Sequence, residues 1–272
     1  MRLIWCFLLL YVVPVRAQFT NFLTQSELGV MAGGSTYIGD INPYNPFYAP
    51  KPAFGLIYRF TINTRLCFRA NVFYGEVQGF DADSQNELQL NRNLSFKSPI
   101  IEGAAGVEFS YFPFQLGNKR HGASAYLLAE LGVFHMNPMA EYEDEWYELQ
   151  PLGTEGQGTS LSDKNPYNLT QLCIPLGVGF KASIGKRCSF SVEFGIRKTF
   201  TDYLDDIGSE SYVDPFQLAF ENGPFAGVLS NRSLNNTRFG RRGVSATKDW
   251  YTFFGGMVAF KLGKKKGCYF KG

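Results

Sequence analysis

An acidic stretch, TDYLDDIGSESYVDP at residues 201–215, holds the side chains best suited to chemistry. Asp202, Asp205 and Asp206 place three carboxylates close together in the chain. Such a cluster could bind Ca²⁺, which takes about 6–8 oxygen ligands, or could pair two carboxylates for hydrolysis. A solvated loop in which the aspartates cap turns is the simplest interpretation. We expect this solvated loop, and Tyr203 and Leu204 favour its packing on the rim of the fold. A cation site at Asp202, Asp205 and Asp206 is the alternative.

General bases are scarce in this chain, which has two histidines. His121 stands beside Lys119 and Arg120, and this cationic setting disfavours a base. His135 ends an apolar segment, with no suitably placed serine on the neighbouring segments. The sequence therefore predicts no catalytic residues, no enzyme activity, no metal and no cofactor. A lipid-modifying esterase built around His135 is the enzymatic alternative.

The N-terminus, MRLIWCFLLLYVVPVRAQ, has the features of an export signal. Arg2 provides a positive start, an apolar run follows, and Ala17 ends a small-residue cleavage pattern. The run is too short to span a bilayer as a helix. We expect a cleaved signal peptide at 1–17, followed by a short lead at 18–26.

The composition suits a membrane barrel better than a helical domain. The chain holds 26 Phe, 15 Tyr and 29 Gly, yet its mean hydropathy is only −0.13. In a transmembrane β-barrel only one face of each strand meets lipid, which gives this mixture. A secreted β-sandwich is the competing fold. A net charge of +2 without a basic cluster indicates no nucleic-acid partner.

Eight segments alternate apolar and polar residues, the period of a β-strand. In CSFSVEFGIRKTF, for example, Phe190, Val192 and Phe194 share one face. The predicted strands are 27–39, 53–62, 66–77, 100–112, 123–134, 172–184, 188–200 and 250–262. Short turns follow the second, fourth and sixth, and long loops (40–52, 78–99, 135–171 and 201–249) follow the others. This alternation is typical of outer-membrane barrels with short periplasmic turns and long extracellular loops.

The sequence therefore predicts an all-β fold, an eight-stranded antiparallel transmembrane barrel over 27–263 with a periplasmic tail at 264–272. Charged residues fall on the face opposite the apolar one, where lipid contact would cost about 2–4 kcal/mol for each Arg or Lys. An eight-stranded lumen is just wide enough for side chains to fill it, so we expect a closed network rather than a channel. Its expected members are Glu27, Arg59, Arg69, Glu102, Glu108, Glu130, Lys181, Glu193, Arg197 and Lys261.

Five stretches resemble the PorG family, outer-membrane barrels of the Bacteroidota type IX secretion system. They are ELGVMAGGSTYIGDINP (27–43), KPAFGLIYRF (51–60), PIIEGAAGVEFSYFPF (99–114), PLGTEGQG (151–158) and FTDYLDDIGSESYVDP (200–215), the last two being the most specific. The resemblance implies a non-enzymatic component that anchors or organises a periplasmic ring at the outer membrane. It implies partners similar to the lipoprotein PorK and the ring subunit PorN. An adhesin or ligand-binding barrel acting through its outer loops is the alternative.

Four cysteines follow the signal peptide, and the periplasm permits disulfides. Cys67, Cys173 and Cys188 lie on strands whose geometry keeps them apart, because a disulfide needs Cα atoms within about 7 Å. Cys268, in the tail KKKGCYFKG, has no such constraint. It is either a free thiol or the site of an intermolecular disulfide with a ring subunit.

Overall fold

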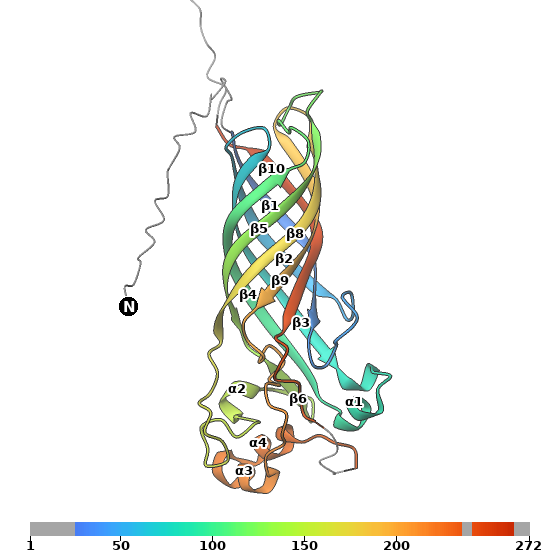
Figure 1. The fold of residues 1–272 in the computed structure, drawn as a ribbon, viewed down its shortest axis with the longest axis vertical. Coiled ribbons are helices and arrows are strands. Elements are labelled where there is room, and N and C mark those ends of the chain that lie inside the picture. The colour runs from blue at the N-terminus through green and yellow to red at the C-terminus, as the bar shows by residue number, and fades with distance from the viewer. Residues whose placement is uncertain (1–24, 236–240, 264–272) are drawn as a thin grey trace, which may run out of the picture.

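A closed barrel of eight antiparallel strands carries a folded cap at one end (Figure 1). The structure is a computed structural model that describes residues 25–235 and 241–263. The expected signal peptide (1–17), most of the lead (18–26) and the tail (264–272) lie outside the described residues. The barrel strands are β1 (Gln25–Ile38), β2 (Lys51–Thr61), β3 (Leu66–Phe80), β4 (Ser95–Ser110), β5 (Ala123–Met136), β8 (Thr170–Ile184), β9 (Cys188–Thr199) and β10 (Trp250–Lys261).

The barrel closes because the first and last strands pair with each other. The β1–β10 ladder runs from Glu27 opposite Lys261 to Ile38 opposite Trp250. The order β3-β2-β1-β10-β9-β8-β5-β4 returns to β3 through the β3–β4 pairing. The predicted fold class is thereby confirmed. Strands β3 and β4 extend farther toward the cap than the sequence predicted, to Phe80 and from Ser95.

The outer wall of the barrel is apolar, as the period of two predicts. Its outward side chains include Leu28, Leu56, Val72, Leu131 and Val178, all strongly exposed. The residues between them point inward and are mostly buried. Each strand therefore presents one apolar face to its surroundings and one face to the lumen. Among the described residues, no helix has the length and apolar character needed to cross a membrane.

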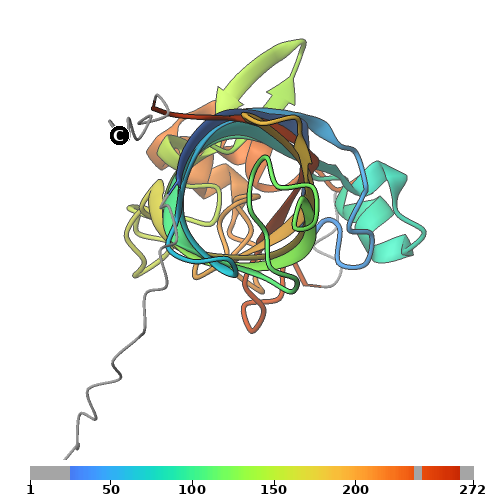
Figure 2. The same cartoon turned by 90° about the horizontal axis from the view of Figure 1, so that it is seen from above.

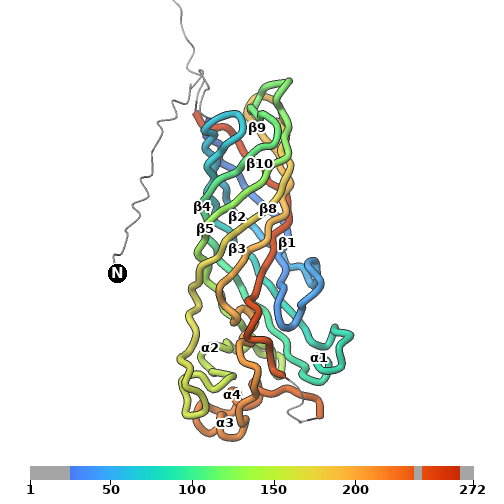
Figure 3. The backbone as a smooth tube through the Cα atoms, viewed as in Figure 1, coloured from blue at the N-terminus to red at the C-terminus, as the bar shows by residue number. Residues whose placement is uncertain are grey.

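The four long loops fold into a cap at the other end from the short turns (Figures 1 and 3). Its elements are η1 (Asp81–Asp83), α1 (Glu87–Arg92), β6 (Met139–Tyr142), β7 (Glu145–Glu148), α2 (Leu149–Leu152), α3 (Pro215–Asn222) and α4 (Pro224–Ser230). The small β6–β7 hairpin joins the barrel sheet where Met139 pairs with Lys97 of β4. One buried hydrophobic cluster runs from the lumen into the cap, from Phe73 and Phe253 to Leu204 and Ile207. The cap and the barrel thus share a core.

Candidate functional site

The lumen is filled by charged side chains at its centre. Nine of the ten predicted members are buried, namely Glu27, Arg59, Arg69, Glu102, Glu108, Glu130, Lys181, Glu193 and Arg197. The tenth, Lys261, is only half-buried; it lies opposite Glu27 in the β1–β10 ladder. The Glu27 carboxylate instead accepts a hydrogen bond from the hydroxyl of Ser189, at 2.6 Å.

Arg69 and Glu108 are the hubs of the network. The Arg69 guanidinium lies 2.7 Å from Glu193, 3.1 Å from Glu130 and 3.6 Å from Glu108. Glu108 also accepts from Arg59 at 3.0 Å and from Lys181 at 2.6 Å. Three acids surround one arginine and three bases surround one glutamate. Such reciprocal pairing is what allows charges to be buried away from water.

A second, smaller group lies nearer the cap. Arg197 Nε is 3.3 Å from Glu102 Oε2, and the Tyr251 hydroxyl donates to the same oxygen at 2.6 Å. The Arg197 guanidinium also stands 5.7 Å from the Phe73 ring centroid and 5.6 Å from that of Phe253. Toward the cap, the buried arginine is therefore surrounded by aromatic rings as well as by a carboxylate.

The β4–β5 turn, residues 111–122, lies over the barrel mouth at the end opposite the cap. Phe114 and Leu116 of this turn are buried, whereas Tyr111 and Phe112 are exposed. The Lys181 ammonium, which points into the lumen, lies 4.5 Å from the centroid of the Phe114 ring. Figure 2 shows a green loop in this part of the chain crossing the barrel mouth. Ion pairs and the buried residues of this turn together occupy the lumen at the end opposite the cap.

The acidic stretch at 201–215 is buried, so the expectation of a solvated loop was wrong. Asp202, Asp205 and Asp206 are 4%, 2% and 1% exposed, and Leu204 is fully buried. The reason is long-range packing, since the stretch inserts between the other loops and the end of the barrel core. The order of polar and apolar residues within 201–215 does not predict packing against distant loops.

Asp206 is the centre of the cap. Tyr167 donates to its carboxylate at 2.6 Å, and the Thr154 hydroxyl donates to the other oxygen. Arg242 lies beside them, donating to the Asp206 carbonyl at 3.1 Å and to Glu155 at 2.6 Å. Burial raises the pKa of Asp206 to about 6, against the opposing effect of Arg242. Asp206 also holds a left-handed backbone, with φ of 65°, which non-glycine residues adopt rarely.

Asp205 faces a second buried carboxylate, Asp249. The Tyr37 hydroxyl lies 2.5 Å from Asp205 and 3.2 Å from Asp249. The backbone N–H groups of Ile207 and Leu204 donate to the remaining oxygens. Burial raises the pKa of both acids well above the ordinary range. Repulsion from Asp249 raises the pKa of Asp205 further, and repulsion from Asp202 and Asp40 raises that of Asp249.

The acids of the stretch are engaged by protein donors rather than arranged as a metal site. Asp202 pairs with Lys248 at 3.3 Å, and Asp205 and Asp206 have the donors given above. Across the described ranges, no group of three or more His, Cys, Asp or Glu side chains has the geometry to hold a metal ion. The alternative of a cation site at Asp202, Asp205 and Asp206 gains no support from this arrangement.

The two most specific stretches of the family resemblance meet inside the cap. Glu155, within PLGTEGQG, accepts hydrogen bonds from the backbone of Gly208 and Ser209 at 3.0 and 2.9 Å. Gly153 and Gly156 of the first stretch have φ of 54° and 80°, values that glycine adopts without strain. Sequence reasoning treated the two motifs separately and missed both this contact and Arg242. The glycine spacing was the only local signal of a sharply turning backbone.

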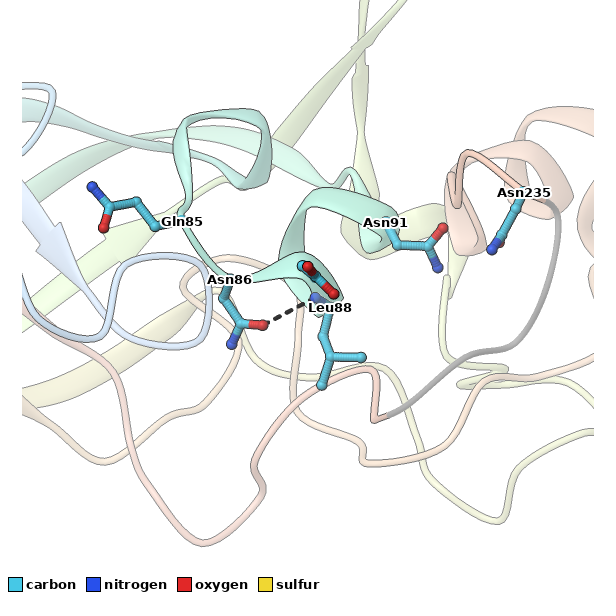
Figure 4. Close-up of a pocket in the computed structure, with 6 residues that line it drawn as sticks. Gln85, Asn86, Leu88, Asn91 and Asn235 are labelled. Atoms are coloured by element: carbon cyan, nitrogen blue, oxygen red, sulfur yellow. Dashed lines mark hydrogen bonds between the residues drawn. The ribbon is translucent and has the colours of Figure 1, made fainter.

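A pocket of about 570 Å³ lies on the outside of the cap beside α1 (Figure 4). Its lining residues are Gln85, Asn86, Glu87, Leu88, Asn91 and Asn235. Asn86 accepts a hydrogen bond from the backbone of Leu88 and so caps the helix. Gln85 points away from Asn91 and Asn235. The side chains of Asn91 and Asn235 instead point toward each other.

Of the cysteines, Cys173 borders the lumen network, since its sulfur lies 3.7 Å from the Tyr251 hydroxyl. Cys67, Cys173 and Cys188 are free thiols, and Cys268 lies outside the described residues. His121 is half-buried in the β4–β5 turn. His135 is exposed and lies 3.1 Å from the Thr170 hydroxyl.

The family described as "Domain of unknown function (DUF6089)" matches residues 2–271 of the chain. No curated protein matches. Three solved outer-membrane proteins are similar in fold. Ail, the attachment invasion locus protein of Yersinia pestis, solved with the heparin analogue sucrose octasulfate, is 8% identical with a TM-score of 0.42, covering 89% of this chain and 100% of its own.

Neisserial surface protein A is 10% identical with a TM-score of 0.40, over 87% of this chain and 97% of its own. The N-terminal barrel domain of Pseudomonas aeruginosa OprF is 9% identical with a TM-score of 0.35, over 88% and 100%. At these identities the similarities concern the fold alone.

Proposed function

The chain belongs to the DUF6089 family, and we propose that it is a non-enzymatic outer-membrane component of the type IX protein secretion machinery. In this role it anchors or organises a periplasmic ring at the membrane. The resemblance to the PorG family supports the proposal, and so does the fold of an outer-membrane barrel. We propose that the apolar outer wall contacts outer-membrane lipid. The periplasmic partners would be similar to PorK and PorN.

The filled lumen is the single observation that carries the proposal. A transport channel or a ligand-conducting barrel needs an open path, whereas Arg69 and Glu108 form five ion pairs across the barrel centre, one of them with each other. The β4–β5 turn adds the buried side chains of Phe114 and Leu116 at the mouth opposite the cap. A barrel that conducts nothing is suited to hold other components in place, and the shared core of cap and barrel makes it a firm anchor.

Deletion of the chain separates the three functions considered. Loss of protein secretion with normal lipid A supports the secretion role. Loss of surface attachment with normal secretion supports the adhesin alternative instead. Altered lipid A with normal secretion would point to an enzyme. Crosslinking in intact membranes, followed by mass spectrometry of the crosslinked proteins, then identifies whether ring subunits are neighbours.

Cys268 provides a test of direct tethering to a ring subunit. We propose that a disulfide at this position can link the tail to a periplasmic partner, because a covalent bond supplements weak docking. Membranes solubilised with thiols blocked would be run on non-reducing gels. A high-mass band that contains this chain, is lost on reduction and is absent in Cys268→Ser supports the tether. A monomer in both samples rules it out, without affecting the anchoring role.

A further inference from the structure

The two ends of the barrel differ completely in their acidic residues. All 24 Asp and Glu residues of the chain lie in barrel strands or in the loops of the cap. The periplasmic turns at 62–65, 111–122 and 185–187 contain none. The same turns carry five basic residues, Arg65, Lys119, Arg120, Lys186 and Arg187. The overall charge of +2 conceals this separation.

All five of these basic side chains are exposed. With no acidic residue in the turns, intramolecular ion pairing does not neutralise them there. The contrast with the lumen is direct, since Arg59 and Arg69 are each held by carboxylates. Uncompensated exposed charges of one sign create a local potential that attracts an oppositely charged partner.

The three turns form one continuous surface rather than three separate tips. The Phe114 N–H donates to the Thr64 carbonyl at 2.7 Å, which ties the β4–β5 turn to the β2–β3 turn. The Gly117 N–H donates to the Ser183 hydroxyl at 2.8 Å, which ties it to the β8–β9 hairpin. Buried Phe114 and Leu116 fix the middle turn in the barrel mouth. The basic groups are therefore presented on a rigid base.

We propose that this basic periplasmic surface, formed by Arg65, Lys119, Arg120, Lys186 and Arg187, docks an acidic face or segment of a periplasmic protein. This proposal goes beyond the proposed function, because it specifies that the partner is acidic and does not depend on which protein the partner is. Complementary charge accelerates encounter and selects the partner, and its contribution falls with salt. An acidic partner would also be repelled from the cap, where 18 of the 24 acids lie, so it would bind at the periplasmic end.

Lipid headgroups fit this surface less well than a protein does. Headgroups surround the outer wall of a barrel, whereas the β4–β5 turn crosses the mouth (Figure 2). The residues of that turn suited to the membrane interface are Tyr111 and Phe112, 65% and 57% exposed and packed edge to face. Lys119 and Arg120 follow on the part of the turn beyond the buried Phe114 and Leu116. Because the turn as a whole lies over the mouth, its basic residues favour a macromolecule approaching from the periplasm.

Binding of a defined acidic polypeptide tests the surface directly. The full chain would be placed in nanodiscs of zwitterionic lipid, with poly-L-glutamate as the probe. We expect binding that weakens as salt rises, and a loss of affinity of about tenfold or more in the double variant Lys119→Glu/Arg120→Glu. The matched control is Lys164→Glu/Arg241→Glu, which makes the same charge change on exposed residues of the cap. Absence of binding, or equal loss in the two double variants, overturns the proposal.

Photo-crosslinking in cells distinguishes a protein partner from lipid. A photo-reactive residue at Asn118 should yield adducts whose crosslinked peptides are rich in Asp and Glu, and Lys119→Glu/Arg120→Glu should reduce them several-fold. Adducts to lipid alone, or to peptides without acidic residues, would contradict the docking surface. Acidic adducts from a protein outside the secretion machinery would support the surface while contradicting the proposed secretion role.

Discussion

The lumen and the cap both bury charge, but they stabilise it in opposite ways. In the lumen, each hub residue is surrounded by opposite charges, as Glu108 is by Arg59, Arg69 and Lys181. In the cap, Asp205 and Asp249 share one tyrosine hydroxyl, and burial raises the pKa of both. The lumen is therefore held by ion pairs, whereas these cap acids are held mainly by neutral donors. The two regions should respond differently to mutation and to pH.

The largest expected effect is in the lumen. Arg69→Leu leaves Glu108, Glu130 and Glu193 without their shared cation, and breaking a buried pair costs about 3–5 kcal/mol. Heat-modifiability on gels should shift to a markedly lower temperature. Arg65→Leu is the matched control, since Arg65 is exposed in the adjoining turn and should leave the transition unchanged. An equal transition for Arg69→Leu and the wild type would show that the ion pairs do not stabilise the barrel.

The next effect should be confined to the cap. Arg242→Met removes the hydrogen bonds to Glu155 and Thr154 that join two loops. Glu155 is then a buried carboxylate without its cation, and the expected cost is again about 3 kcal/mol. Limited proteolysis should cut loops 137–169 and 200–249 faster, while barrel heat-modifiability stays unchanged.

The neighbouring residue supplies the control for this experiment. Arg241 has a side chain that is 69% exposed and pairs weakly with Glu210 at 3.7 Å. Arg241→Met should therefore leave the proteolysis pattern as in the wild type. If Arg242→Met instead lowered the transition of the barrel, the cap and the lumen would be one cooperative unit rather than two.

A smaller expected effect is a pH dependence of the stability of the cap. Burial raises the pKa of Asp206 from the ordinary 3.8 to about 6, so the folded cap binds a proton more tightly than the unfolded chain does. Stability from this group is fully present below about pH 4 and is lost as the pH rises through about 6, by up to about 3 kcal/mol. Asp205 and Asp249 shift in the same direction. Cap loops should resist proteases better at pH 5 than at pH 7.5.

Two substitutions check the source of that pH dependence. Asp206→Asn removes the titrating group while keeping its size, so the difference between pH 5 and pH 7.5 should shrink. Asp163→Asn, on an exposed loop residue, should retain the full difference. Loops that become more sensitive at pH 5 would reverse the sign and contradict buried, proton-binding aspartates.

The sequence predicts the barrel well because strand alternation is a local signal. Most predicted strand boundaries lie within about two residues of the observed ones, and the inward parity of Glu108 or Arg197 follows directly from it. Strand alternation does not predict which lumen residues pair with each other. It shows that a side chain faces the lumen, but not which opposite charge it contacts there. Glu193, for example, contacts Arg69 and Tyr126 across the barrel, whereas the nearer bases Arg197 and Lys181 pair with other acids.

The cap could not be predicted because its contacts join distant loops. Asp206 meets Thr154 and Tyr167, 52 and 39 positions away in the chain. Nothing within the acidic stretch distinguishes a buried aspartate from an exposed one. The hydrophobic residues Leu204 and Ile207 inside it were the one local sign of burial. These two residues indicated that the stretch packs against something, but they did not identify the loops and barrel residues that it contacts.

Electrical conductance tests the central claim, that the barrel is filled and conducts nothing, most directly. Purified full-length protein in planar lipid bilayers should show no steady conductance, because ion pairs and the β4–β5 turn occupy the lumen. A known porin under the same conditions would confirm that open barrels are detected. Brief, irregular events at high voltage are compatible with a filled barrel. A stable, ohmic open pore would contradict the account.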